Sequence, residues 1–147
     1  MGNKPCEVCS PKGIKEKRHY GPFAYRDFPG MRLTTPIQLR TCRKCGEIFL
    51  KSNDSKELDR ACEKTILDHT REFIEGLVER HGTSQAYIAK NLLGISPVYL
   101  TELKKGEKIP SYALYNLLKL LAKDEKACAA IEADNYPAPI PATGYRR

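Results

Sequence analysis

The sequence predicts an α+β fold, in which a small N-terminal β-module is followed by an all-α domain. Four of the six cysteines form two C-x2-C pairs, and the residues between the pairs carry turn signals and an alternating pattern. A long stretch with apolar residues at helical intervals follows, and then come shorter helical patterns separated by Gly and Pro. We expect a β-module at 1–51, a connecting helix at 52–82, a helical domain at 83–133 and a Pro-rich tail at 134–147.

Composition excludes several classes of protein. The 147 residues include 25 Lys and Arg against 18 Asp and Glu, so the net charge is +7. No run approaches the roughly 18 apolar residues of a membrane span, and the N-terminus lacks the apolar segment of a signal peptide. We therefore expect a cytoplasmic protein with no membrane partner, whose cysteines are metal ligands or thiols rather than disulfides.

The positive charge is unevenly distributed along the chain. Residues 1–51 contain 11 Lys and Arg against 4 Asp and Glu, whereas residues 52–147 contain 14 of each. The whole excess therefore belongs to the β-module. A basic surface suits a polyanionic partner.

The two C-x2-C pairs are Cys6 with Cys9 and Cys42 with Cys45. Each pair can form a tight turn whose two thiolates point at one ion, and Gly46 suits such a turn. Two pairs make a closed tetrahedral site, which is structural rather than catalytic. We therefore predict one structural Zn²⁺ per chain. The alternatives are a redox pair, which is expected beside a βαβ pattern that is absent here, and a chance pairing of thiols.

The residues between the pairs predict a β-hairpin or meander. Ile37–Thr41 alternates as a strand does, and Glu47–Leu50 would be a closing strand. Gly21-Pro22 and Pro29-Gly30 predict turns. His19 is an alternative metal ligand in this segment, although a surface position is the favoured interpretation.

Residues 52–82 predict one long amphipathic helix. Its apolar side is formed by Leu58, Cys62, Thr65, Ile66, His69, Phe73, Ile74 and Leu77. We interpret Cys62 and His69 as core residues rather than ligands. Asp54 is the expected N-cap, and Gly82 is the expected stop. The helix is either the first helix of the all-α domain or a rigid connector from the β-module.

Residues 83–111 predict two short helices joined by a tight turn. Thr83 or Ser84 would cap the first helix, and Ser96 would cap the second. Gly94 is expected to adopt a positive φ in the turn. The residues expected to face the core are Ala86, Ile88, Ala89, Leu92, Ile95, Leu100 and Leu103.

Two helices joined in this way form the DNA-binding helix-turn-helix, whose second helix lies in the major groove. The residues expected at base edges are Ser96, Val98, Tyr99 and Glu102, with Thr101 beside them on the outward side. The residues expected to hold phosphates are Gln85, Lys104, Lys105 and Lys108. The alternative is a compact helical pair with a solvated lysine face.

Two further helices are predicted at the C-terminal end. Ser111 would cap a helix with an apolar stripe at Leu114, Leu117, Leu118 and Leu121. Most of these leucines are expected in the core, although an excess of leucine here often serves a dimer seam. We expect a short helix at 124–133 in which Cys128 is a buried thiol, and a tail at 134–147 that is disordered or an extended arm.

The segment 85–111 resembles the Xre/Cro–repressor family of DNA-binding domains. The family pattern is matched by Gln85, Ile88, Ala89, Gly94, Ile95, Ser96, Leu100, Leu103, Gly106 and Pro110. One departure is an additional residue within Asn91-Leu92-Leu93, before Gly94. An extra residue at this point can lengthen the turn. It also shifts the alignment with the family by about one position, so the family's base contacts do not transfer residue by residue.

The two halves together resemble the MqsA family of antitoxins, also described as YgiT-type zinc-finger regulators, over residues 5–125. The resemblance implies that Cys6, Cys9, Cys42 and Cys45 bind zinc and that the zinc domain binds a cognate toxin. It further implies that the C-terminal domain forms a homodimer on a palindromic double-stranded DNA operator and represses its own operon. Such a protein would be encoded by a prokaryote or a phage.

The long continuous helix and the strongly basic module both depart from that family. A basic surface is poorly matched to a basic ribonuclease toxin and well matched to an acidic partner or to phosphates. The first hypothesis is a homodimeric zinc-containing repressor, an antitoxin that autoregulates its operon. The alternatives are a mainly protein-binding antitoxin, and a phage or plasmid regulator whose zinc module is a second nucleic-acid contact. We expect no enzyme, because the acids and three histidines form no catalytic constellation.

Overall fold

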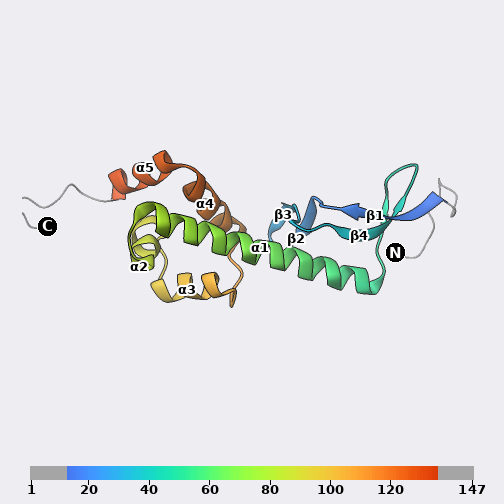
Figure 1. The fold of residues 1–147 in the computed structure, drawn as a ribbon, viewed down its shortest axis with the longest axis horizontal. Helices are drawn as coiled ribbons and strands as arrows, with labels where there is room; N and C mark the ends of the chain where they lie inside the picture. Colours follow the sequence, from blue (N-terminus) through green and yellow to red (C-terminus); the bar gives the residue numbers. More distant parts are fainter. Residues whose placement is uncertain (1–12, 136–147) are drawn as a thin grey trace, which may run out of the picture. The chain divides into compact units, whose positions relative to one another are not determined.

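The computed structural model describes residues 13–135, which form a mixed α+β fold (Figure 1). Antiparallel strands come first and helices follow, so the predicted α+β class is confirmed. The chain divides into two compact units, with the boundary between Ile66 and Leu67. That boundary lies inside the long helix α1 (Ser52–His81).

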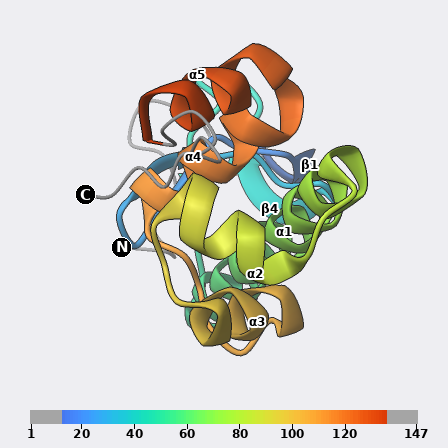
Figure 2. The same cartoon turned by 90° about the vertical axis from the view of Figure 1, so that its left-hand side faces the viewer.

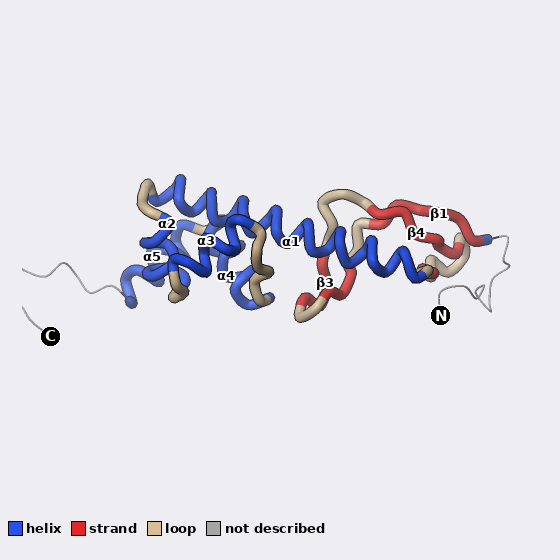
Figure 3. The backbone as a smooth tube through the Cα atoms, turned by 90° about the horizontal axis from the view of Figure 1, so that it is seen from below, coloured by secondary structure: helices blue, strands red, loops and turns tan. Residues whose placement is uncertain are grey.

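The first unit contains two small antiparallel sheets. The larger sheet has the strand order β1–β4–β5, with β1 (Ile14–His19), β4 (Ile37–Cys42) and β5 (Ile48–Phe49). The smaller sheet pairs β2 (Phe23–Tyr25) with β3 (Phe28–Met31). β1 and β4 lie side by side along their full length, from Ile14 opposite Cys42 to His19 opposite Ile37 (Figure 3). The strands predicted around 37–41 and 47–50 are therefore present.

The turn predicted at Pro29-Gly30 is wrong, because both residues lie within β3. The chain turns instead between Tyr25 and Phe28, which pair across β2 and β3. Phe28 and Met31 flank the Pro-Gly pair and are 1% and 4% exposed. Burial of these two side chains places the turn earlier, and a two-stranded sheet tolerates proline because both of its strands are edges.

Helix α1 contains 30 residues, as the periodicity predicts. Its start differs in detail, because Asp54 lies inside the first turn and its Oδ2 accepts the Lys51 backbone N–H at 2.8 Å. Asp54 therefore supplies the backward half of a capping box instead of being the cap. At the other end, the Gly82 N–H donates to the Val78 carbonyl at 3.0 Å, with φ at 56°. The predicted glycine stop is confirmed.

The second unit is helical. After the end of α1 come α2 (Gln85–Tyr87), the π-helical segment η2 (Ile88–Leu93), α3 (Pro97–Lys105), α4 (Tyr112–Lys123) and α5 (Glu125–Asn135). α2 and α3 are neighbours, as are α4 and α5 (Figure 2). None of the helices described combines the length and apolar character needed to cross a membrane.

One apolar cluster holds the second unit together. Its buried members are Ile74, Leu77, Ile88, Ala89, Leu92, Leu93, Leu100, Leu103, Leu118, Leu121 and Cys128. Ile74 and Leu77 belong to α1, so the C-terminal part of that helix is the first helix of this unit. The residues of α1 before Leu67 belong to the other unit. The part of α1 from Leu67 onward thus packs as the first helix of the all-α unit, and the rigid-connector alternative stays a prediction.

Polar contacts support this cluster. Arg80 donates from Nη1 to the Leu121 carbonyl at 2.9 Å, and from Nη2 to the Ala122 carbonyl, at the C-terminal end of α4. His69 Nδ1 lies 3.0 Å from the Tyr115 hydroxyl. Cys62, which belongs to the first unit, is 1% exposed, and burial raises the pKa of its thiol. Cys62 is therefore a core residue as predicted, whereas His69 is half-buried and contacts the Tyr115 hydroxyl.

Candidate functional site

The segment from Ser84 to Lys105 consists of two short helices and a tight turn. Ser84 Oγ accepts the Tyr87 N–H at 3.2 Å, and Ser96 Oγ accepts the Tyr99 N–H at 3.1 Å. Gly94 ends the first helix with φ at 67°. The capping and turn roles predicted for Ser84, Gly94 and Ser96 are confirmed. These caps fix where α3 begins and which way its first turn points.

The segment directly before Gly94 is π-helical. The Gly94 N–H donates to the Ala89 carbonyl, five residues back, which is the π-helical bond. The turn itself is short, since Gly94 ends the first helix and Ser96 caps the second. The π-helical segment also buries both Leu92 and Leu93, which are 4% and 9% exposed. An extra residue rotates the preceding residues by about 100° relative to a regular helix, and Ala86, which was expected to face the core, is exposed.

Helix α3 has a buried side and an accessible side, as predicted. Leu100 and Leu103 are fully buried, whereas Val98 is 70% exposed. Ser96 is also exposed, and Tyr99, Thr101 and Glu102 are half-buried. Val98, Tyr99 and Glu102 therefore lie on the accessible side of α3, and Ser96 caps its N-terminal end.

Three of the predicted contact residues lie together at this surface. Lys108 Nζ is 3.5 Å from Glu102 Oε2 and 6.0 Å from the centre of the Tyr99 ring. An ion pair this exposed contributes little to stability. Lys108 can therefore leave Glu102 for a stronger anion, and Glu102 is then free to accept a hydrogen bond.

A cavity of about 600 Å³ lies beside α3. Its lining residues are Arg71, Gln85, Thr101, Lys104 and Lys105. Gln85 Nε2 donates to Thr101 Oγ1 at 3.0 Å. Three of the lining side chains are cationic, and the described lining includes no acid.

Arg71 is the member of this cavity that the sequence analysis missed. It lies on α1, and its Nη2 is 3.4 Å from Asp68 Oδ1 one turn earlier in that helix. The sequence gives little indication of this role, because a basic residue on the polar side of a long helix usually only faces solvent. Its position beside Gln85 and Lys104 depends on how α1 packs against α2 and α3.

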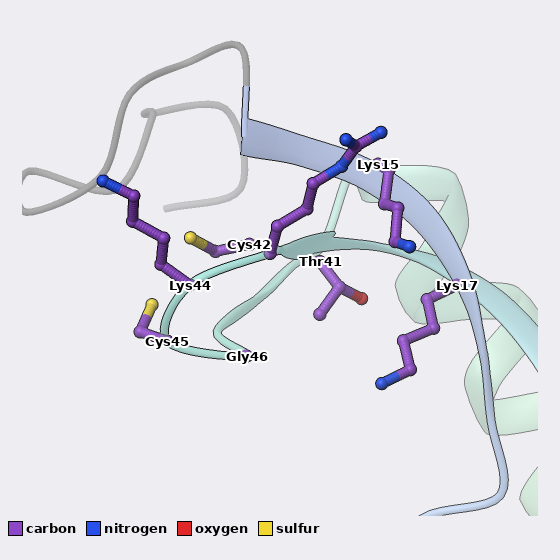
Figure 4. Close-up of a pocket in the computed structure, with 8 residues that line it drawn as sticks. Lys15, Lys17, Thr41, Cys42, Lys44, Cys45 and Gly46 are labelled. Atoms are coloured by element: carbon purple, nitrogen blue, oxygen red, sulfur yellow. The ribbon is translucent and has the colours of Figure 1, made fainter.

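The predicted metal ligands Cys42 and Cys45 lie on one turn after β4. Cys42 is 1% exposed and Cys45 is exposed. The Gly46 N–H donates to the Cys42 carbonyl at 3.0 Å, with φ at 75°, which closes the turn. Figure 4 shows both sulfur atoms on the same side of it. This arrangement fits two thiolates that bind a single ion.

The other two predicted ligands, Cys6 and Cys9, lie outside the described residues. Among residues 13–135 there is no group of three or more His, Cys, Asp or Glu that could hold a metal. The four-cysteine site therefore stays a prediction, to which the Cys42–Cys45 turn contributes its geometry.

His19, the alternative ligand, is engaged elsewhere through Nε2. That atom lies 2.6 Å from Thr41 Oγ1, which itself donates to the Leu39 carbonyl at 3.1 Å. His19 Nε2 is therefore held in a hydrogen bond with Thr41 in this arrangement and does not point at the cysteine turn as a free ligand.

No family model matches the chain, and the comparison with curated proteins finds no match. Any statement of function therefore rests on the residues and the geometry described above.

Proposed function

We propose that this protein is a sequence-specific DNA-binding transcriptional repressor, with the segment from Gln85 to Lys105 as its helix-turn-helix. The observation that supports this most strongly is the two-sided character of α3. Leu100 and Leu103 anchor the helix to the core, and its accessible side carries side chains able to contact bases. Cations gather at its C-terminal end, where Lys104 and Lys105 meet Arg71 at the cavity.

The side chains of α3 suit base edges. A helix with its side chains is about 10–12 Å across, and the major groove is about 12 Å wide. In that groove, Val98 would contact a thymine methyl group, and Glu102 would accept from a cytosine amino group. Tyr99 and Ser96 supply hydroxyl groups at the N-terminal end of the helix, which reaches base edges in this class of domain.

The cavity beside α3 suits the DNA backbone. Lys104 and Lys105 of α3 and Arg71 of α1 supply the positive charge there. Phosphate contacts fix the position of a protein on the duplex without reading its sequence. Arg71 is therefore added to Gln85, Lys104, Lys105 and Lys108 as a proposed phosphate contact.

A homodimer is part of this proposal, because such domains bind two half-sites about one helical turn apart on a palindromic operator. Helix α4 offers a surface for the second copy. Leu120 and Tyr112 lie on it and are 53% and 37% exposed, although both are large apolar side chains. Their burial against a symmetry-related α4 would remove this apolar surface from water.

The β-module is proposed to bind one structural Zn²⁺ through Cys6, Cys9, Cys42 and Cys45. Such an ion would tie the start of the module to the turn after β4 and would contribute much of the folding free energy of so small a unit. The family resemblance supports an antitoxin that represses its own operon, with a cognate toxin as the protein partner. A closed site leaves no position for substrate, which agrees with a protein that is not an enzyme.

The test compares two variants on DNA from upstream of the protein's own gene and on scrambled DNA. Tyr99→Ala should reduce the preference for the upstream DNA by about tenfold or more, because a base contact contributes about 1–3 kcal/mol of discrimination. Lys104→Gln should weaken binding to both DNAs equally. Lys126→Gln, an exposed change on α5 away from α3 and from the proposed dimer surface, is the matched control. If Tyr99→Ala and Lys104→Gln act alike, the proposed docking of α3 is wrong.

A further inference from the structure

A second basic surface surrounds the turn that carries Cys42 and Cys45. It borders a cavity of about 450 Å³. The described lining holds four cations and no acid, and the cations are Lys15, Lys17, Arg43 and Lys44. Residues 13–51 carry nine Lys and Arg against three Asp and Glu, a difference of six. This surface is where part of that excess gathers.

The strand pairing aligns two of these cations. Lys15 pairs with Thr41 across β1 and β4, and Lys17 lies two residues further along β1 on the same face. Glu16 lies between them in sequence and points to the opposite face, where its cross-strand partner is Arg40. The one acid of β1 is therefore turned away from Lys15 and Lys17. Both lysines are exposed.

The other two cations belong to the cysteine turn. Arg43 and Lys44 lie between Cys42 and Cys45, and the Arg43 N–H donates to the Gly13 carbonyl at 2.7 Å. Four thiolates around one Zn²⁺ would carry a net charge of two negative units, which Arg43 and Lys44 would offset. Lys15 and Lys17 are different, because Figure 4 shows them on the Thr41 side and the sulfur atoms on the other side of the turn. Their charge is therefore left for an external anion.

We propose that Lys15 and Lys17 bind phosphates of the same DNA duplex that α3 reads, so that the β-module is a second, sequence-independent DNA contact. This inference rests on the proposed function. The lining of the cavity favours DNA over an acidic protein, because its described residues include no aromatic or aliphatic side chain of the kind that anchors protein interfaces. Interfaces with DNA are more polar and more positively charged.

The experiment measures binding of the zinc-loaded full chain to its upstream DNA over a range of salt concentrations. The variant Lys15→Gln/Lys17→Gln removes two charges from this surface. If both lysines contact phosphates, the slope of log K against log salt should decrease in magnitude by about 1.8, at roughly 0.9 for each phosphate contact. The preference for upstream over scrambled DNA should stay unchanged, because these residues touch no base.

The matched control is Arg18→Gln/Lys51→Gln, which removes the same charge from exposed positions, with Arg18 on the opposite face of β1. It should leave the slope at the wild-type value. Zinc content of both variants is measured so that an unfolded module is recognised. Equal slopes for the two double variants, or a wild-type slope for Lys15→Gln/Lys17→Gln, would overturn the inference. If the wild-type protein binds upstream and scrambled DNA equally well, the proposed function is overturned. The salt slopes measured on either DNA would still show whether Lys15 and Lys17 contact phosphates.

Discussion

Gln85 donates from Nε2 to Oγ1 of Thr101 at 3.0 Å, which joins the first residue of α2 to the middle of α3. Thr101 Oγ1 in turn donates to the Pro97 carbonyl at 3.0 Å. The hydroxyl thus accepts one hydrogen bond and donates another, and it links the two helices. The sequence predicts both residues only as DNA contacts. In the structure they also set the position of α3 relative to α2.

Replacing Thr101 with Val should therefore affect stability and DNA binding together. The variant removes both hydrogen bonds of the hydroxyl at nearly constant volume and leaves the Gln85 amide with one partner fewer. We expect a loss of about 1 kcal/mol in the free energy of unfolding, measured in urea. DNA affinity should decrease because α3 is less well positioned. Thr101→Ser keeps the hydroxyl and should behave like the wild type. If Thr101→Val and Thr101→Ser lower the free energy of unfolding equally, the hydroxyl does not have the linking role described above.

Two glycine-to-alanine changes should have opposite signs. Gly94 has φ at 67°, and a Cβ added there would meet no atom within 4 Å, so its cost is conformational alone, about 1–2 kcal/mol for Ala. Gly76 lies inside α1 with equally open space, and Ala should stabilise the helix there by about 0.5–1 kcal/mol. Thermal and urea unfolding of the two variants measure the difference. If Gly76→Ala destabilises the protein, or if Gly94→Ala leaves its stability unchanged, backbone conformation does not determine the effect of alanine at these positions.

Placing a charge on the exposed side of α4 should dissociate the proposed dimer. We expect Leu120→Glu to convert a dimer into a folded monomer in sedimentation equilibrium at micromolar concentration, because a carboxylate is costly to bury without a partner. Affinity for a palindromic operator should decrease with it. Ala129→Glu adds the same charge at an exposed position of α5 and should leave the dimer intact. A Leu120→Glu variant that stays dimeric would place the interface elsewhere.

Metal analysis of purified protein should give one zinc per chain. Cys42→Ser or Cys45→Ser should reduce zinc affinity by more than about tenfold. Changing a residue that only hydrogen-bonds a metal ligand already costs about tenfold or more, and removing the ligand itself should cost more. Cys62→Ala should retain the metal, because Cys62 is buried in α1 and burial raises the pKa of its thiol, which disfavours the thiolate that binds zinc. Full zinc content in Cys42→Ser would exclude the four-cysteine site.

The parts of the fold that depend on local pattern could be predicted from the sequence. Helical periodicity located α1, and the serine caps located the starts of α2, α3 and α4. In each case the signal lies within a few residues of the feature. The same is true of Gly82 and Gly94, where a positive φ follows from the turn itself.

The features that depend on distant contacts could not be predicted. No local signal predicts the π-helical segment Ile88–Leu93, in which both Leu92 and Leu93 are buried. Arg71 enters the cavity beside α3 because of helix packing. The turn expected at Pro29-Gly30 lies elsewhere because Phe28 and Met31 are anchored in the interior. Each of these outcomes was decided by tertiary packing.

The most direct test of the proposed function is the binding of wild-type protein to DNA from upstream of its own gene and to scrambled DNA, followed by fluorescence anisotropy at increasing salt. A sequence-specific regulator predicts a preference on the order of 10³ or more that persists at physiological salt. Weak and equal binding to both DNAs that disappears as salt increases would contradict it, because the positive charge alone would then account for the binding.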